Sequence, residues 1–315
     1  MKIAFVLKGN IRRRRLFERQ LRRLKDAFPE AEVNVLESKH AGQSRELAAS
    51  LCGQCDYLVA VGGDGTINEA VNGCFNAHLT NPALKLPHFA ILAHGTANDM
   101  ARSLGLTGRM RALCKLLEQG QTRYIDIGKL QCASTSGKFL ERLFVNMADI
   151  GIGAEVTQQL GKRSCYLGSN LHYLNATLST FLSYEHKELS VTFDGQSQWQ
   201  GKTLALVVAN GRYFGSGLCV APGATLNDGQ FFTTLIGNAS TVDFVRNLRR
   251  LKKGIPLNHP EVRYDHAHKL EIDSEGVPAP IEVDGELIGV TPATFSILPL
   301  AVSFVAPPAP DCDIP

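Results

Sequence analysis

Short apolar runs alternate with amphipathic stretches over the first part of the chain. Runs of four or five mostly apolar residues predict buried strands at 3–7, 33–36, 57–61 and 89–92. Between the first two runs, apolar residues recur at helical spacing on one face, at Phe17, Leu21, Leu24 and Phe28. Similar patterns predict helices at 68–77 and 110–119. This alternation of strands and helices predicts an α/β domain with a parallel sheet covered on both faces.

After about residue 124 the pattern becomes that of β-structure joined by turns. Strands are expected at 130–132 and 139–147 around the turn at 134–137, and Asp194-Gly195 predicts a hairpin between 189–193 and 203–208. Asp228-Gly229 precedes a further strand at 230–236, and helices are expected at 167–181 and 241–251. We therefore expect an α/β domain over 1–127, a β-rich domain over 128–305 and a loose tail over 306–315.

Composition narrows the functional class. The 315 residues are 44% hydrophobic and 20% charged, with a net charge of +3, which suits a globular protein and is too weak to indicate nucleic-acid binding. No run approaches the roughly 20 apolar residues of a membrane span, and we interpret the apolar start of the chain as a strand, not a signal peptide. The eight cysteines contain one CxxC pair, Cys52 and Cys55, and are expected to be reduced thiols. These features predict a cytoplasmic protein.

The strongest local signal is Gly-Gly-Asp-Gly-Thr-Ile-Asn-Glu at 62–69, which follows a predicted strand and opens a helix. Glycines let the backbone approach a bulky anion, and a helix N-terminus offers free N–H groups to phosphate. Thr66 adds a hydroxyl donor, and Asp64 would repel bare phosphate unless Mg²⁺ lies between them. The alternative is a glycine turn in which Asp64 caps the helix.

A second loop of the same kind is His94-Gly95-Thr96-Ala97-Asn98-Asp99. It also lies between a predicted strand and a helix, so both loops are expected at the carboxyl edge of one parallel sheet, where ligands bind. Together they predict a nucleotide pocket. The alternative for Asn98 and Asp99 is simple helix capping.

In both loops the sequence resembles diacylglycerol-kinase-type catalytic domains, a group that includes sphingosine and ceramide kinases, and most resembles the bacterial lipid kinases of the YegS and BmrU type. Gly-Thr-Ala-Asn-Asp-Met-Ala-Arg at 95–102 is similar to the second signature loop of that family. Further segments follow in the family's order over roughly residues 57 to 305, at 123–128, 144–148, 151–156, 210–215, 221–222, 227–229 and 283–286.

The resemblance implies a two-domain lipid kinase whose first domain is similar to that of NAD kinases and phosphofructokinases and whose second is a β-sandwich, with the active site in the interdomain cleft. It implies that ATP binds to residues of both loops and to Ser38, namely Ser38, Gly62, Gly63, Asp64, Gly65, Thr66, Ile67, Asn68, Gly95, Thr96 and Asn98. It implies a structural Mg²⁺ held by the Asp228 side chain and the carbonyls of Thr225 and Gln230. In place of the family's usual first loop, Asn-Pro-x-Ser-Gly, the chain has Lys-Gly-Asn-Ile-Arg at 8–12.

The same resemblance implies the catalytic groups. Asp284 or Glu286 would accept the proton of the lipid hydroxyl, and the sequence does not choose between them. Two further roles follow from position in the loops and from the needs of phosphoryl transfer, not from the resemblance: Asp64 would hold the Mg²⁺ that bridges the phosphates, and Arg102 would reach the transferred group. Without the resemblance, Asp284 and Glu286 are interpreted as ordinary hairpin residues, and Arg102 fits a surface salt bridge equally well.

The acceptor is expected to be a membrane lipid, with diacylglycerol, phosphatidylglycerol and sphingoid bases all left open. Basic residues of the first predicted helix, Arg12 to Arg15, Arg19, Arg22 and Arg23, could contact an anionic membrane surface peripherally, or be a solvated helix face. A homodimer is left open. The rival functions are a related kinase acting on NAD or a sugar phosphate, and a non-catalytic regulator that binds nucleotide or lipid.

Overall fold

The structure is a computed structural model that describes residues 1–309 except 10, 12–13 and 163–183. The chain divides into two compact units. Unit 1 comprises Met1–Ile125 and the segment that begins at Leu300, and unit 2 comprises Asp126–Pro299. No helix within the described residues is long and apolar enough to cross a membrane.

Unit 1 is built on a parallel sheet. Its strands are β1 (Lys2–Leu7), β2 (Glu32–Glu37), β3 (Tyr57–Gly62) and β4 (His88–Ala93), in the order β2-β1-β3-β4. All four were predicted from the apolar runs, and each prediction is confirmed within two residues.

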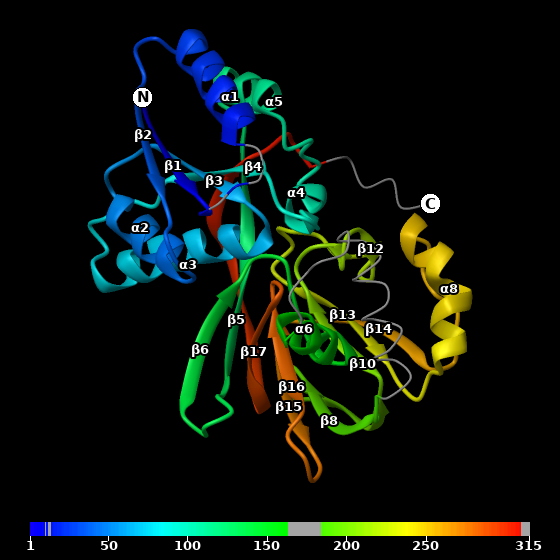
Figure 1. Ribbon diagram of the computed structural model, residues 1–315. Coiled ribbons are helices and arrows are strands. Elements are labelled where there is room, and N and C mark those ends of the chain that lie inside the picture. The colour runs from blue at the N-terminus through cyan, green and yellow to red at the C-terminus, as the bar shows by residue number, and fades with distance from the viewer. Residues whose placement is uncertain (10, 12–13, 163–183, 310–315) are drawn as a thin grey trace. The chain divides into compact units, whose positions relative to one another are not determined.

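Helices cover this sheet on both faces (Figure 1). They are α1 (Arg14–Ala27), α2 (Gln43–Leu51), α3 (Asp64–Thr80), α4 (Asp99–Ser103) and α5 (Met110–Glu118). Phe17 and Leu24 of α1 pack with Leu113 and Leu117 of α5 against alternate residues of β1 and β3. Helices α2 and α3 pack closely together on the other face.

The last strand of unit 1 comes from the far end of the chain. Strand β17 (Glu286–Val305) leaves unit 2 at Pro299, and its final residues lie parallel to β4 with Phe304 opposite Phe89. The two rings lie 5.6 Å apart, and Ala306 is buried. Residues 300–305, which the sequence grouped with the second domain, therefore belong to the sheet of the first.

Unit 2 is built of antiparallel strands. One series runs β14-β13-β10-β7-β16-β17, with β14 (Val262–Ala267), β13 (Phe231–Ile236), β10 (Ala205–Ala209), β7 (Met147–Gly151) and β16 (Pro280–Val283). A second continues from β17 through β15 (Lys269–Ser274) and β8 (Lys187–Phe193) to β9 (Ser197–Thr203), and β17 also pairs with β5 (Thr122–Ala133), which pairs with β6 (Phe139–Phe144). Its described residues also include the helices α6 (Ile152–Lys162) and α8 (Thr241–Lys253) and the short strands β11 (Tyr213–Phe214) and β12 (Leu218–Cys219).

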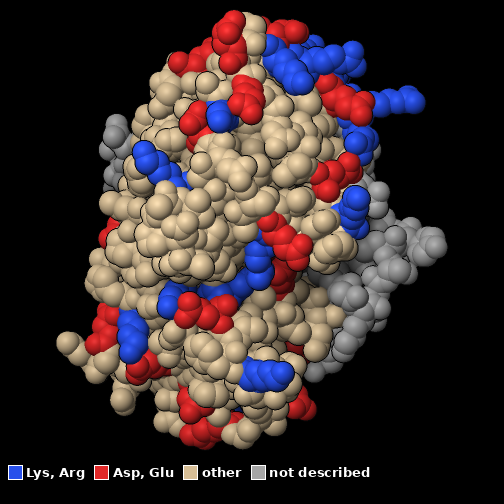
Figure 2. Space-filling model, turned by 90° about the vertical axis from the view of Figure 1, so that its left-hand side faces the viewer, with Lys and Arg blue, Asp and Glu red and all other residues tan. Residues whose placement is uncertain are grey.

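The core of unit 2 lies between inward-facing residues of these strands, among them Phe144, Phe231 and Phe295, which are fully buried. The rings of Phe144 and Phe231 stack at 5.7 Å, and Phe295 meets Phe144 edge-on at 6.0 Å. The predicted fold class, a parallel α/β domain followed by a β-rich one, is confirmed. On the face shown in Figure 2, positive and negative side chains are interspersed, as expected from a net charge of +3.

Two predictions of local structure were wrong, one helix was missed, and one prediction falls outside the described residues. The strand expected at 139–147 is interrupted after residue 144, where β6 ends, and β7 begins at Met147. The hairpin at Asp194-Gly195 joins β8 to 197–203, not to 203–208, because its true partner is a polar edge strand whose sequence carries no apolar run. Helix α2 was missed because its buried face uses small residues such as Ser44 and Ala48. The helix expected at 167–181 lies outside the described residues.

The tight packing of α2 on α3 predicts an unusual response to an alanine substitution. A β-carbon at Gly73 would overlap the carbonyl oxygen of Arg45 and lie 3.1 Å from the β-carbon of Ala48. Glycine to alanine inside a helix normally stabilises by about 1 kcal/mol, whereas overpacking costs about 1–3 kcal/mol. Gly73→Ala should therefore lower the free energy of unfolding, measured by urea denaturation.

The matched control for this prediction is Asn76→Ala, on the exposed side of the same helix. It should leave stability unchanged or raise it slightly. A Gly73→Ala protein as stable as the Asn76→Ala protein would show that the two helices can separate at no cost.

Candidate functional site

Two loops lie side by side at the carboxyl edge of the unit 1 sheet. Strand β3 ends at Gly62 and leads into α3 at Asp64, and strand β4 ends at Ala93 and leads into α4 at Asp99. The strands are parallel neighbours with Gly62 opposite Ala93, and the His94 N–H donates to the Gly62 carbonyl at 2.9 Å. The predicted residues of loops 62–68 and 95–98 are thus brought together.

The closest approach of the loops is between two glycines. A β-carbon built on Gly63 would lie 3.1 Å from the Cα of Gly95, and one built on Gly95 would overlap the Cα of Gly63. Gly95 therefore accepts no side chain while the loops keep this spacing, and a side chain at Gly63 would be crowded. Gly62 serves a different contact, because a β-carbon there would lie 2.7 Å from the β-carbon of Thr66.

Polar side chains fix both loops in this arrangement. The Asp64 carboxylate accepts a hydrogen bond at 2.9 Å from the N–H of Met100, in the first turn of α4. Asn98 has a left-handed backbone (φ 54°), and its amide bonds both the N–H and the carbonyl of Gly95 at 3.0 Å. Asp64 therefore caps the helix of the other loop, while Asn98 closes its own loop.

The remaining residues expected to contact the nucleotide differ in how far they are buried. Ile67 and Asn68 are buried, with the Asn68 side-chain oxygen accepting from the Asn72 amide at 3.0 Å, so their side chains belong to the interior of α3. Thr66 is 6% exposed, whereas Thr96 is exposed. Gly65 is partly exposed. Helix α3 begins at Gly63 with no side-chain cap hydrogen bond, and in its first turn the Thr66 N–H donates to the Gly63 carbonyl at 3.0 Å.

Ser38 and Arg102 have partners within unit 1. The buried Ser38 hydroxyl accepts from the Gly9 N–H at 3.0 Å, which ties the loop after β1 to the end of β2. Arg102 forms a 2.5 Å ion pair with Asp99, one turn earlier in α4. This pair matches the salt bridge that was the alternative interpretation of Arg102.

The acidic residues predicted as proton acceptors lie in the β16–β17 hairpin of unit 2. Its two-residue turn, Asp284-Gly285, has positive φ at both positions (47° and 90°), the geometry of a type I′ turn. The Asp284 carboxylate is buried and accepts three backbone N–H bonds of 2.9–3.1 Å, from Val145, Asn146 and Met147. Asp284 thus binds the hairpin to the segment between β6 and β7.

Glu286 is in a more open position. It forms a 2.6 Å ion pair with Arg142 of β6, and its side chain is 38% exposed while that of Arg142 is 8% exposed. The ion pair orients the carboxylate and leaves part of it accessible to solvent. Of the two acidic groups proposed from the sequence, Glu286 is therefore the accessible one.

Two buried carboxyl groups beside this hairpin were missed by sequence reasoning. Glu282 of β16 lies opposite Asp149 of β7, and both are buried. Burial, and then the neighbouring Asp149, hold the pKa of Glu282 well above its ordinary value. Burial raises the pKa of Asp149 to about 7, although the N–H groups of Ala154 and Gly153 oppose the rise. In the sequence, Glu282 is a single polar residue between two apolar residues of a strand and belongs to no recognised motif, so nothing marked it as buried.

The residues expected at a structural Mg²⁺ lie in a turn before β13. The Asp228 carboxylate is exposed and accepts a hydrogen bond from the Gln230 N–H at 3.2 Å. The N–H of Gly229, between these two residues, donates to the buried Asp126 at 2.7 Å. Thr225 lies in the same turn. Within the described part of the chain, no group of three or more His, Cys, Asp or Glu side chains could hold a metal. One carboxylate and backbone carbonyls are ligands that Mg²⁺ accepts, so the turn fits the ion, and its role stays a prediction.

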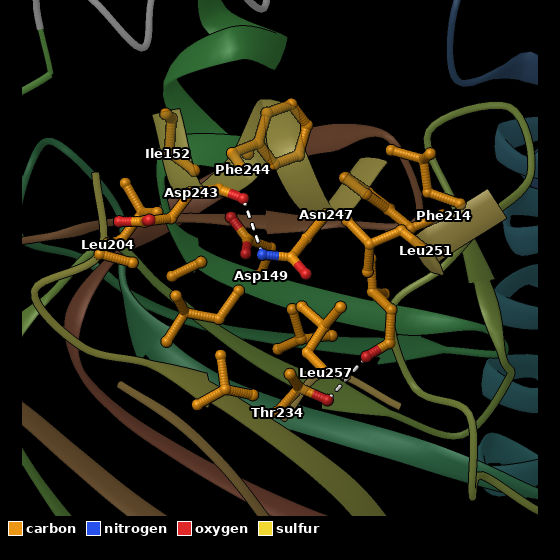
Figure 3. Close-up of a pocket in the computed structure, with 18 of the residues that line it drawn as sticks. Asp149, Ile152, Leu204, Phe214, Thr234, Asp243, Phe244, Asn247, Leu251 and Leu257 are labelled. Carbon is orange, nitrogen blue, oxygen red and sulfur yellow. Dashed lines mark hydrogen bonds between the residues drawn. The ribbon is translucent and has the colours of Figure 1, made fainter. Parts of the chain in front are cut away.

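Unit 2 also contains an apolar cavity of about 110 Å³, shown in Figure 3. Residues of β7, α6, β10, β13, α8 and β14 line it, and labelled apolar side chains around it include Ile152, Leu204, Phe214, Phe244, Leu251 and Leu257. Asp149 is one of its few acidic lining residues, and Tyr264 and His259 add polar tips. A cavity lined mainly by apolar groups is suited to a hydrocarbon chain.

Comparison with known proteins matches both units. Residues 9–130 match the model of the diacylglycerol kinase catalytic domain, and residues 146–306 match the YegS C-terminal NAD kinase beta sandwich-like domain. The chain is 28% identical to a diacylglycerol kinase of Bacillus subtilis strain 168, over 98% of this chain and 97% of the relative. It is also 28% identical to a YegS-like lipid kinase of Shewanella frigidimarina, over 86% of this chain and 83% of the relative.

Solved structures share the fold. A diacylglycerol kinase from Bacillus anthracis superposes with a TM-score of 0.71 at 21% identity, over 98% of this chain and 97% of that one. Yeast NADH kinase complexed with NADH superposes with a TM-score of 0.54 at 12% identity, over 96% and 82%. The predicted likeness to the NAD kinase fold is confirmed.

The glycine contact predicts that Gly95→Ala will separate the two loops. The added methyl group must displace Gly63, which weakens the bond between Asp64 and the Met100 N–H. The Met100 amide should then exchange with deuterium at least about ten times faster, measured by mass spectrometry or NMR. Thr96→Ala, an exposed substitution in the same loop, should leave this exchange unchanged. Equal protection of the Met100 amide in both variants would contradict the proposal that the contact between Gly63 and Gly95 holds the two loops together.

The raised pKa of Asp149 predicts a pH-dependent stability difference. The unfolded carboxyl group titrates near about 3.9, whereas the folded one titrates at about 7. Between these values the native state holds a proton that the unfolded state has lost, so native stability falls as pH rises. Asp149→Asn removes this penalty.

Relative to the wild type, Asp149→Asn should therefore gain stability from pH 4 to pH 8, by on the order of 2–4 kcal/mol in urea denaturation. Asp26→Asn, an exposed control on α1, should run parallel to the wild type. Parallel curves for Asp149→Asn and the wild type would mean that this carboxyl group titrates normally.

Proposed function

The chain belongs to the diacylglycerol kinase catalytic-domain family, and on that premise we propose that it is an ATP- and Mg²⁺-dependent kinase that phosphorylates a hydroxyl group of a membrane lipid. Family membership makes it a phosphotransferase with an alcohol acceptor. The nucleotide, the metal and the lipid are our inference. The observation that carries it is the pair of glycine loops held together before an uncapped helix N-terminus.

The loops of unit 1 fit a triphosphate. Helix α3 begins directly after the loop glycines without a side-chain cap, and the partial positive charge at the N-terminus of this 17-residue helix favours an anion there. The exposed Thr96 and the partly exposed Gly63, Asp64 and Gly65 are among the loop residues that a ligand can touch. Ile67 and Asn68 contribute through the backbone of the helix.

In this proposal ATP supplies the γ-phosphoryl group, and Mg²⁺ neutralises charge on the phosphates. Asp64 has one oxygen bonded to the Met100 N–H and is the acidic group nearest the loop glycines in sequence, so we propose it as the residue that holds the metal side of the nucleotide. Arg102 remains a candidate for the transferred group once its pair with Asp99 opens. Ser38 acts by positioning the loop after β1.

Glu286 is our preferred proton acceptor for the lipid hydroxyl. Asp284 is fully engaged with three backbone N–H groups, and moving a proton onto it would weaken all three bonds. Glu286 is accessible and is oriented by Arg142. We therefore assign Asp284 to positioning the hairpin and Glu286 to the chemistry.

The acceptor class follows from the apolar cavity of unit 2 and from the relatives. The Bacillus subtilis relative is named diacylglycerol kinase, so diacylglycerol is the first acceptor to test. A hydrocarbon chain in the cavity would gain about 0.8 kcal/mol per buried methylene. NAD, the acceptor type suggested by the yeast neighbour, offers no such chain, which favours the lipid.

The test of the proposed function is phosphorylation from radiolabelled ATP. The purified protein should label diacylglycerol or a related lipid in a Mg²⁺-dependent manner, with the product identified after extraction into organic solvent. Phosphatidylglycerol, a sphingoid base and NAD complete the panel. Labelled NAD, with no labelled lipid, would contradict the assignment. ATP bound without any product would favour a regulator.

Glu286→Gln should abolish most turnover without unfolding the protein. A general base is typically worth about 10²–10⁴ in rate, so kcat should fall by that factor while the urea midpoint stays close to that of the wild type. The matched control is Glu271→Gln, an exposed carboxylate of the same unit that is paired with Lys269. Wild-type turnover in Glu286→Gln would remove this residue from the mechanism.

A further inference from the structure

Helix α8 forms one wall of the apolar cavity of unit 2. A capping box between Ser240 and Asp243 starts the helix, and Gly254 in the left-handed conformation ends it. Its inner face lines the cavity with Asp243, Phe244, Asn247 and Leu251, which Figure 3 shows around the same space. The inner face of the helix is therefore part of the proposed acceptor site.

The outer face of α8 carries charge of one sign. Its exposed basic residues are Arg246, Arg249, Arg250, Lys252 and Lys253. Its one acidic residue, Asp243, is on the cavity side and is bonded to Ser240. Among the residues that the structure describes, no salt bridge involves any of these five basic side chains. On the face shown in Figure 2, by contrast, basic and acidic side chains are interspersed.

The helix dipole explains only part of this charge. Basic residues in the last turn of a helix are stabilising, which accounts for Arg250, Lys252 and Lys253. Arg246 and Arg249 precede that turn and gain little from it, because the effect is confined to the final turn. A second cause is needed for the charge in the middle of the helix.

Apolar side chains are exposed beside the basic ones. Val242 is 55% exposed, and Ile255, just after the helix, is 42% exposed. With about 3.6 residues per turn, positions 242, 246, 249 and 253 form one stripe, so Val242 shares its side of the helix with three basic residues. This side of the helix therefore offers positive charge to anionic lipid headgroups and an exposed apolar side chain beside that charge.

We propose that the outer face of α8 docks the protein on an anionic lipid bilayer, so that the cavity behind the helix takes its acyl chain from the membrane on which the helix lies. The cavity's use rests on the proposed function, whereas the docking does not. Each basic residue near an anionic surface contributes about 1 kcal/mol. A nucleic acid would satisfy the charges but would leave Val242 and Ile255 without a partner, so the bilayer is favoured.

The first experiment measures binding to vesicles by flotation, without ATP. Vesicles of phosphatidylcholine with about one-third phosphatidylserine are compared with phosphatidylcholine alone, so no phosphorylatable acceptor is needed. The triple variant Arg246→Gln, Arg249→Gln and Lys253→Gln should bind anionic vesicles about a hundredfold more weakly than the wild type. None of the three residues lines the cavity.

The matched control removes the same charge from α1, through Arg19→Gln, Arg22→Gln and Arg23→Gln, all exposed. It should bind as the wild type does within a few-fold. Loss of binding in the α1 variant but not in the α8 variant would overturn the proposal in favour of the first helix. Equal loss in both would show that only net charge matters and would also overturn it.

A site-specific probe tests where the contact lies. The chain has one tryptophan, Trp199, so Val242→Trp in a Trp199→Phe background reports from the outer face alone. Its fluorescence should shift to the blue on addition of anionic vesicles. Vesicle binding with no shift would place the contact elsewhere. Stronger binding to a DNA duplex than to anionic vesicles at equal salt would assign the face to nucleic acid.

Activity measurements separate this proposal from the proposed function. With a short-chain diacylglycerol in solution, the α8 triple variant should keep wild-type turnover, whereas on anionic vesicles its rate should fall in proportion to the lost binding. Equal rates on vesicles and in solution would contradict the coupling of docking to acceptor supply. Normal vesicle binding by a protein that phosphorylates no lipid would sink the proposed function and leave the docking intact.

Discussion

The backbone contact between Gly63 and Gly95 is the constraint on which the nucleotide side of the protein depends. A β-carbon on Gly95 would overlap the Cα of Gly63, and one on Gly63 would crowd the Cα of Gly95 at 3.1 Å. With the loops at this spacing, Asp64 can cap the helix of the second loop, while the N-cap residue of α3 is Gly63, which has no side chain. The glycines of the first loop are thus packing residues before they are binding residues: Gly62 makes room for Thr66, and Gly63 for Gly95. Phosphate affinity at the helix N-terminus is a consequence of how the two loops pack.

In unit 2 the environment decides the role of each carboxyl group. Three acidic residues alternate along one hairpin, yet each has a different partner. Asp284 is bound by three N–H groups and is structural, whereas Glu286 is paired with Arg142 and remains accessible. Glu282 is buried beside Asp149, one of its oxygens without a hydrogen-bond partner among the described residues, and burial raises its pKa well above the ordinary value. A sequence shows the carboxyl groups but not their hydrogen-bond donors, which come from strands more than a hundred residues away.

The sequence could predict the features that are marked by neighbouring residues, and it could not predict contacts between distant segments. Strands β1, β3 and β4 are apolar runs buried on both faces, so their composition reveals them, and the loops that follow β3 and β4 contain the motif residues. Helix α2 and strand β9 were missed or misplaced because small or polar residues build their contacts. The carboxyl ends of β3 and β4 could be placed at one edge, but the capping of α4 by Asp64 spans 36 residues and has no local pattern. Asp149 and Glu282 become neighbours only through the pairing of β7 with β16.

The protonation of Asp149 and the chemistry of the cavity depend on each other. An ionised carboxylate in an apolar cavity carries a large desolvation cost, so a group that must lie there holds its proton instead. With its pKa at about 7, Asp149 is largely neutral below that pH, and the cavity wall then presents a hydrogen-bonding group without net charge. Such a wall admits a hydrocarbon chain at little cost. It offers no solvation to the charged phosphates of NAD or a sugar phosphate, so burying them there is unfavourable. The buried carboxyl group therefore does not argue against a lipid acceptor, because in its neutral form it lines an apolar cavity without the desolvation cost of an ionised carboxylate.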